Sequence, residues 1–134
     1  MSLLSSPQFL RAVVWFDALT GILLGSLHLL MTSALSEGLG LAPGLLQVSG
    51  VLLLGYAALA ASIARAQPLP LGRLRVLIVG NGAWALASLA LWVGAAPAPT
   101  LLGQIYLAVH VVSVALLAEL QWMGARRQPG LLAA

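Results

Sequence analysis

Four apolar runs, each about as long as a membrane is thick, dominate this sequence. They cover residues 12–35, 44–64, 76–96 and 100–123. At 1.5 Å per residue, a helix of about 20 residues crosses the roughly 30 Å hydrocarbon core of a bilayer. The runs lack the two-residue alternation of membrane barrel strands. The sequence therefore predicts four transmembrane helices in a single integral membrane domain that spans residues 1–134.

The composition of the 134-residue chain also favours a membrane protein over a soluble one. Apolar residues make up 61% of the chain and charged residues only 7%, whereas soluble domains carry about 25% charged residues. The chain has no cysteine, which excludes a disulfide scaffold and a thiolate metal site. Its six basic residues are dispersed arginines, so they form no patch that could follow nucleic-acid phosphates.

Turn-forming residues separate the four runs. Gly38 and Pro43 follow the first run, Pro70 the second, and Pro97 and Pro99 the third. Proline favours the first turn of a helix, so we expect Pro43 and Pro99 at helix starts. Short connections make successive helices antiparallel neighbours. The predicted fold is all-α, a four-helix bundle with up-down-up-down topology.

The charged residues between the runs predict the orientation of the bundle. All the arginines fall on one side, namely Arg11, Arg65, Arg73, Arg75, Arg126 and Arg127, and Glu37 falls on the other. By the positive-inside rule, both termini of this multi-pass protein should be cytoplasmic. Trp15 and Trp122 lie near the arginine side and Trp92 near the opposite side, as in an aromatic belt.

The two halves of the chain show a weak internal similarity. Arg11 precedes Asp17 by the same spacing that separates Arg75 from Asn81, and the second and fourth runs open on similar Ala-Pro sequences. Two helical hairpins repeated in one orientation would be related by an axis along the membrane normal. Sequences rich in Leu and Ala also produce such matches by chance. A tandem repeat of two hairpins and a coincidence are therefore both open.

Polar side chains in the predicted spans are the candidate binding residues. Asp17, Thr20 and His28 fall on one stripe of the first helix, and Asn81 should lie at the depth of Asp17. An ionisable group in a membrane costs about 2.5 to 3.5 kcal/mol on insertion scales. Asp17 and Asn81 form either the floor of a binding cavity open to the cytoplasm, or interhelical hydrogen bonds worth about 0.6 to 2 kcal/mol. The second interpretation is favoured.

The fourth run adds His110 and Glu119. The predicted depths of His28 and His110 differ by only about 5 Å, which would allow a shared ligand such as bis-histidine haem. Haem propionates seek cations, and the outer half of the predicted bundle, where both histidines lie, has no basic residue. Neutral histidines bonded to neighbouring helices are therefore the favoured state. For Glu119 we expect a salt bridge to the arginines at the end of its own helix.

Small residues in the first run predict close helix packing. Gly21 and Gly25 form a GxxxG motif, which lets two helix backbones approach each other. The motif does not show whether the partner helix belongs to the same chain or to a second copy of it.

Several short motifs are distributed along the chain. They are Phe16-Asp17-Ala18, Asn81 followed by Trp84 and Ser88, Pro99-Thr100 with Gly103, and Ala118-Glu119-Leu120-Gln121 before an arginine pair. Together they resemble the motifs of a group of small four-span bacterial inner-membrane proteins. The resemblance covers nearly the whole chain. It implies a four-helix fold in the bacterial inner (plasma) membrane, and it implies no activity, cofactor or functional residues.

The sequence contains no nucleophile elbow, phosphate loop or zinc-protease motif. We therefore expect a protein without enzymatic activity, catalytic residues, metal or cofactor, which binds a small lipophilic or amphipathic ligand or a membrane partner. The lipid bilayer is the expected environment, a homo-oligomer or a membrane-protein partner is an option, and no nucleic acid is expected. The alternatives are an oligomeric transporter or channel subunit in which Asp17 titrates, and a haem-binding protein. The candidate ligand-binding residues are Asp17, Thr20, His28, Asn81, His110 and Glu119.

Overall fold

The computed structural model describes residues 6–94 and 98–128, which form five helices and, within that part of the chain, no strand. They are α1 Pro7–Leu30, α2 Thr32–Leu39, α3 Pro43–Arg65, α4 Leu71–Gly94 and α5 Leu101–Arg126. All except the short α2 are long and apolar enough to cross a membrane. The predicted all-α fold, with four helices long and apolar enough to span a membrane, is confirmed.

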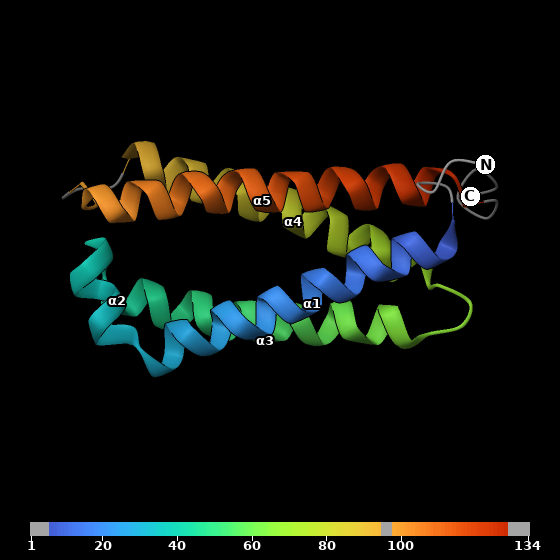
Figure 1. Ribbon diagram of the computed structural model, residues 1–134, viewed down its shortest axis with the longest axis horizontal. Coiled ribbons are helices and arrows are strands. Elements are labelled where there is room, and N and C mark those ends of the chain that lie inside the picture. The colour runs from blue at the N-terminus through green and yellow to red at the C-terminus, as the bar shows by residue number, and fades with distance from the viewer. Residues whose placement is uncertain (1–5, 95–97, 129–134) are drawn as a thin grey trace.

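The long helices form two hairpin-like pairs that lie side by side. Figure 1 shows α1 beside α3 along one side of the molecule and α4 beside α5 along the other. Helix α1 also contacts α5, whereas α3 and α4 touch each other much less than the helices within each pair do. Successive long helices run antiparallel, as the short connections predict.

All six arginines lie at one end of the bundle, which we call the arginine end. It comprises the first turns of α1 and α4 and the last turns of α3 and α5, and Glu37 in α2 lies at the opposite end. The guanidinium of Arg65 lies 5.5 Å from the ring centre of Trp15, and that of Arg126 lies 5.7 Å from the ring centre of Trp122. These cation–π contacts place both tryptophans at the arginine end, as predicted.

The first apolar run, 12–35, does not form one helix. Helix α1 ends at Leu30, and α2 starts at Thr32, because the helical conformation is interrupted at Met31, whose φ is −118°. The hydroxyl of Thr32 donates a hydrogen bond of 2.6 Å to the carbonyl of His28, and such side-chain bonds compete with the helical ladder. Residues 32–39 form a separate helix at the end of the bundle.

At the arginine end, each of the four long helices extends beyond its apolar window. Ser6 caps α1 by accepting a hydrogen bond from the amide of Phe9, and Pro7 occupies the first turn. Pro43 opens α3, whereas Pro99 precedes the N-cap of α5, Thr100. Charged residues fit the helix ends because arginine side chains can reach towards water. Residues 95–97, which hold the end of the third window and Pro97, lie outside the described residues.

Helix α2 is fastened to the start of α5. Its C-cap is Gly40, whose φ of +66° is a left-handed conformation that glycine adopts without strain. Next to it, the amide of Thr100 donates to the carbonyl of Leu39 at 3.1 Å, and the Thr100 hydroxyl donates to the carbonyl of Gly38 at 2.7 Å. These bonds connect the two hairpin pairs at the end opposite the arginines.

The GxxxG glycines of α1 pack against α3 of the same chain. A Cβ atom on Gly25 would lie 2.9 Å from Leu54 Cγ and 3.0 Å from the carbonyl oxygen of Gly50. A Cβ atom on Gly21 would lie 3.1 Å from the Cβ of Ala57. The motif therefore serves packing within the chain, which answers the question that the sequence left open.

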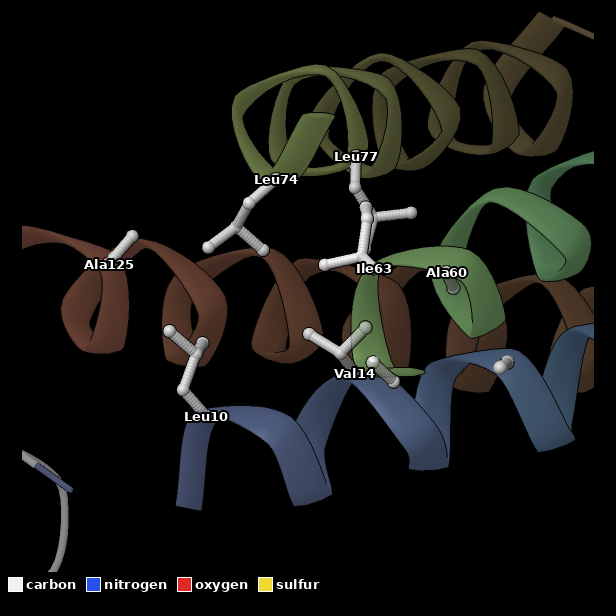
Figure 2. Packing of buried hydrophobic residues seen from close by; sticks show 9 residues of the cluster. Leu10, Val14, Ala60, Ile63, Leu74, Leu77 and Ala125 are labelled. Carbon is white, nitrogen blue, oxygen red and sulfur yellow. The ribbon is translucent and has the colours of Figure 1, made fainter. Parts of the chain in front are cut away.

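The buried apolar residues form one cluster at each end of the bundle. At the arginine end, side chains from α1, α3, α4 and α5 converge (Figure 2); they include Leu10, Val14, Ala60, Ile63, Leu74, Leu77 and Ala125. We call these residues the apolar plug. The cluster at the opposite end consists of Leu39, Leu41, Leu46 and Leu107. The buried polar residues lie between the two clusters.

Candidate functional site

Asp17, Asn81 and Gln121 form a closed triangle of hydrogen bonds inside the bundle. The amide of Asn81 donates to Asp17 Oδ2 at 2.7 Å and to Gln121 Oε1 at 3.2 Å, and the Gln121 amide donates to Asp17 Oδ2 at 2.6 Å. The three residues come from α1, α4 and α5, and Gln121 is completely buried. This polar triangle joins three helices by side-chain bonds, as the favoured interpretation of Asp17 and Asn81 predicts.

The two residues paired by the internal similarity, Asp17 and Asn81, meet across the bundle. Each lies about 15 Å along its own helix, counted at 1.5 Å per residue. The apolar plug separates them from the arginine end, because Leu10 and Val14 precede Asp17, and Leu74 and Leu77 precede Asn81. This arrangement favours interhelical hydrogen bonds over the alternative of a binding cavity that opens from Asp17 and Asn81 towards the arginines.

His28 connects α1 with α3 and α5. Its Nδ1 lies 2.8 Å from the hydroxyl of Ser49, and its Nε2 lies 2.7 Å from the hydroxyl of Tyr106. Ser49 donates its own proton to the carbonyl of Leu46, so Ser49 can only accept from His28. The proton of a neutral His28 ring is therefore on Nδ1, and Tyr106 then donates to Nε2.

His110 is bonded to α4 through Trp84. The indole nitrogen of Trp84 donates to His110 Nε2 at 2.6 Å. Since an indole can only donate, His110 Nε2 carries a lone pair, and the proton of the neutral ring is on Nδ1. The ring of His110 also stacks on Tyr106, with 5.7 Å between the ring centres. The prediction of histidines bonded to neighbouring helices is confirmed for both.

A cavity of about 420 Å³ opens beside these rings. Its walls are mostly leucines and other apolar residues. The polar residues that line it come from four helices and are His28, Ser49, Trp84, Ser88, Tyr106 and His110. The described lining contains no Asp, Glu, Lys or Arg. The space therefore combines an apolar volume with a few neutral hydrogen-bonding groups, which is typical of small-molecule sites.

The cavity opens between α3 and α4. Its exposed lining residues are Leu45, Val48 and Leu52 on α3 and Ala87 on α4. Closer to the arginine end, the hydroxyl of Tyr56 holds the two helices together by contacting the carbonyl oxygens of Val76 at 3.2 Å and Leu77 at 2.8 Å. The mouth therefore faces sideways rather than towards either end of the bundle.

The remaining predicted site residues lie apart from the cavity. Thr20 lines a smaller neighbouring space with Asp17 and Asn81, and its hydroxyl bonds to carbonyls of its own helix. Glu119 is exposed on α5, and the expected salt bridge to its helix end is not formed among the described residues. Within that part of the chain, no group of three or more His, Asp or Glu residues could hold a metal ion.

Sequence reasoning missed Gln121, Tyr106, Trp84 and Ser49. A signal for two of them was present, because Tyr106, His110, Leu117 and Gln121 recur on α5 at alternating steps of four and seven residues. That spacing places all four on one helix face. Trp84 and Ser49 gave no comparable signal, because a tryptophan or serine in an apolar helix is equally suited to a lipid-facing or packing position.

Comparisons with known proteins leave the site to be judged by its geometry. No protein-family model, no curated protein and no solved structure matches this chain.

Proposed function

We propose that this chain is a non-enzymatic integral membrane protein that binds a small neutral lipophilic or amphipathic molecule in the cavity beside His28 and His110. The observation that carries the proposal is the cavity itself. Its volume of about 420 Å³ falls within the roughly 300 to 1,000 Å³ of small-molecule sites. Its apolar walls suit a hydrocarbon chain or ring, and its neutral polar groups suit a carbonyl or a hydroxyl.

The chemistry of the lining supports a neutral ligand. An anionic headgroup such as a carboxylate or phosphate would lack a basic partner there, and a cation would lack an acidic one. Burying an unpaired charge is costly, whereas a carbonyl or hydroxyl can bond to the hydroxyl of Ser88. Quinones, isoprenoid alcohols and related lipids belong to this chemical class.

The position of the mouth supports access from the lipid. If the four long helices span a bacterial inner membrane, with the arginine end cytoplasmic by the positive-inside rule, the opening between α3 and α4 faces the hydrocarbon. A lipophilic molecule could then enter without crossing water. The apolar plug at the arginine end favours such binding over transport through a single chain.

Haem is a weaker candidate for the same cavity. Iron bound between His28 and His110 would take the Nε2 atoms that now accept hydrogen bonds from Tyr106 and Trp84, or would require both rings to turn. Purified protein without a Soret absorption band would exclude this alternative.

The binding proposal is tested by thermal unfolding of the purified protein with decylubiquinone, farnesol and palmitate as probes. A ligand present at 100 times its Kd stabilises the folded state by about 2.7 kcal/mol. We expect decylubiquinone or farnesol to raise the melting temperature and palmitate to leave it unchanged. Stabilisation by palmitate alone, or no stabilisation by either neutral probe, would contradict the proposal.

Matched variants locate the binding. Ala87 lines the mouth of the cavity, whereas Ala83, one turn earlier on α4, is also exposed but lies outside the lining. Ala87→Phe should abolish the stabilisation by the neutral probes, and Ala83→Phe should preserve it. Equal responses of the two variants would show that the probes bind elsewhere.

A further inference from the structure

A second, smaller cavity lies between the polar triangle and the ligand cavity. It has a volume of about 50 Å³, and Asp17, Thr20, Asn81 and His110 are among its lining residues. Trp84 and His110 line both spaces, so their hydrogen bond stands at the boundary between them. We call this smaller space the inner chamber.

Two residues that line the inner chamber, Asp17 and His110, have polar atoms whose bonding capacity is not used. Asp17 accepts both amide bonds of the polar triangle on Oδ2, and its Oδ1 bonds to no described residue. His110 uses Nε2 to accept from Trp84, so its protonated Nδ1 is a donor, and Nδ1 bonds to no described residue. Among the described residues, Gln128 Nε2 is the one fully buried side-chain N or O atom that has no hydrogen-bond partner. The free atoms of Asp17 and His110 therefore open onto accessible space.

The size of the chamber suits water. A cavity needs roughly 10 to 15 Å³ of probe-occupied volume and two to four polar partners to hold one water molecule. A volume of about 50 Å³ meets the first condition. A carboxylate oxygen, an imidazole N–H and the Thr20 hydroxyl oxygen, which can still accept, meet the second.

We propose that the inner chamber is a hydrated site in which bound water accepts a hydrogen bond from His110 Nδ1 and donates one to Asp17. Such water connects the polar triangle to the wall of the ligand cavity through the ring of His110. The water site itself does not depend on ligand binding; only its role as a connection to the ligand rests on the proposed function.

The two histidines of the chain make the proposal testable by solid-state NMR of 15N-histidine protein in lipid bilayers. Both rings should be neutral with the proton on Nδ1. Magnetisation should pass from water to Nδ1 of His110 more strongly than to Nδ1 of His28, which donates to Ser49. A His28→Gln variant assigns the two signals. Absence of transfer from water to His110 in the unaltered protein would overturn the proposal.

A pair of variants on α5 separates the chamber from the rest of the bundle. Val114 lines the chamber, whereas Val112 is 58% exposed on the outside. Val114→Phe should fill the chamber and remove the transfer to His110, and Val112→Phe should leave it intact. Val114→Leu is a smaller change for the same test if the phenyl group prevents folding. Undiminished transfer after a folded Val114 variant would contradict the water site, whatever the outcome of the ligand experiments.

Discussion

At the scale of single residues, the polar triangle explains how this bundle accommodates a carboxylate between membrane-spanning helices. Asp17 is 9% exposed and Asn81 5% exposed, and the two amides place their donors on one carboxylate oxygen. A net hydrogen bond between neutral groups is worth about 0.5 to 1.5 kcal/mol, and a bond to an ionised acceptor about 1.5 to 3 kcal/mol. Removal of one member should therefore affect the other two.

Replacing Asn81 by leucine tests this coupling. Asn81→Leu removes two bonds of the triangle and should lower the free energy of unfolding by about 1 to 3 kcal/mol, because polar groups are left without partners. The same change should cost much less in an Asp17→Leu background. Reversible unfolding of the two single variants and the double variant gives the coupling energy. Additivity within about 0.5 kcal/mol would mean that the residues act independently.

The sequence was sufficient to predict part of this site. Asp17, Asn81 and the two histidines are conspicuous because polar residues in apolar helices are costly. Their partners could not be identified, since the pairing of His28 with Ser49 and Tyr106 depends on how three helices are rotated about their axes. Rotation is set by packing across the whole bundle, which residue types alone do not specify.

At the scale of helices, small residues decide where the helices approach each other. Gly80 on α4 faces Tyr56 on α3 so closely that an added Cβ would overlap the tyrosine hydroxyl, whereas a Cβ on Gly82 would meet nothing within 4 Å. The contact between α3 and α4 therefore needs glycine at position 80, and this contact closes the arginine side of the cavity mouth.

Alanine substitutions at the two positions provide a matched test. Gly80→Ala should destabilise the protein by about 1 to 3 kcal/mol, because overpacking displaces Tyr56 from its bonds to α4. Gly82→Ala should be neutral or stabilising by up to about 1 kcal/mol, because alanine favours helix. Thermal unfolding in detergent measures both. Equal effects of the two variants would show that the Tyr56 contact does not hold α3 against α4.

The apolar runs predicted the four long helices, but they did not predict a helix end that depends on tertiary contacts. The break at Met31 lies inside a continuous apolar window, and nothing in the composition of residues 12–35 indicates it. The separate α2 is held in place by bonds between Gly38, Leu39 and Thr100, which come from segments far apart in the sequence. Such a helix end cannot be found from local pattern.

At the scale of the whole molecule, the bundle consists of two helix pairs. The apolar plug joins them at the arginine end, the bonds of Thr100 to α2 join them at the opposite end, and the cavity lies between these contacts. The up-down-up-down order, which the sequence predicts, places α1 beside α3 and α4 beside α5. The cavity depends on how little α3 and α4 contact each other, a property of the assembled bundle that no single apolar run encodes.

Membrane orientation can be measured with single cysteines, because the natural chain has none. Gly38 and Gly72 lie at opposite ends of the bundle, and a side chain at either position has open space. In intact cells, a membrane-impermeant maleimide should label Gly38→Cys but not Gly72→Cys, and permeabilised cells should show both labelled. Labelling of Gly72→Cys alone would reverse the orientation, and labelling of both in intact cells would contradict four membrane crossings.

A neutral lipophilic molecule should occupy the space beside His28 and His110 when the protein leaves the membrane. Native mass spectrometry of the protein released from mild detergent measures this most directly. The unaltered protein and Ala83→Phe should each carry an uncharged lipid of defined mass, and Ala87→Phe should not. Spectra in which all three proteins are free of bound lipid, or in which Ala87→Phe retains the same molecule, would contradict binding in this cavity.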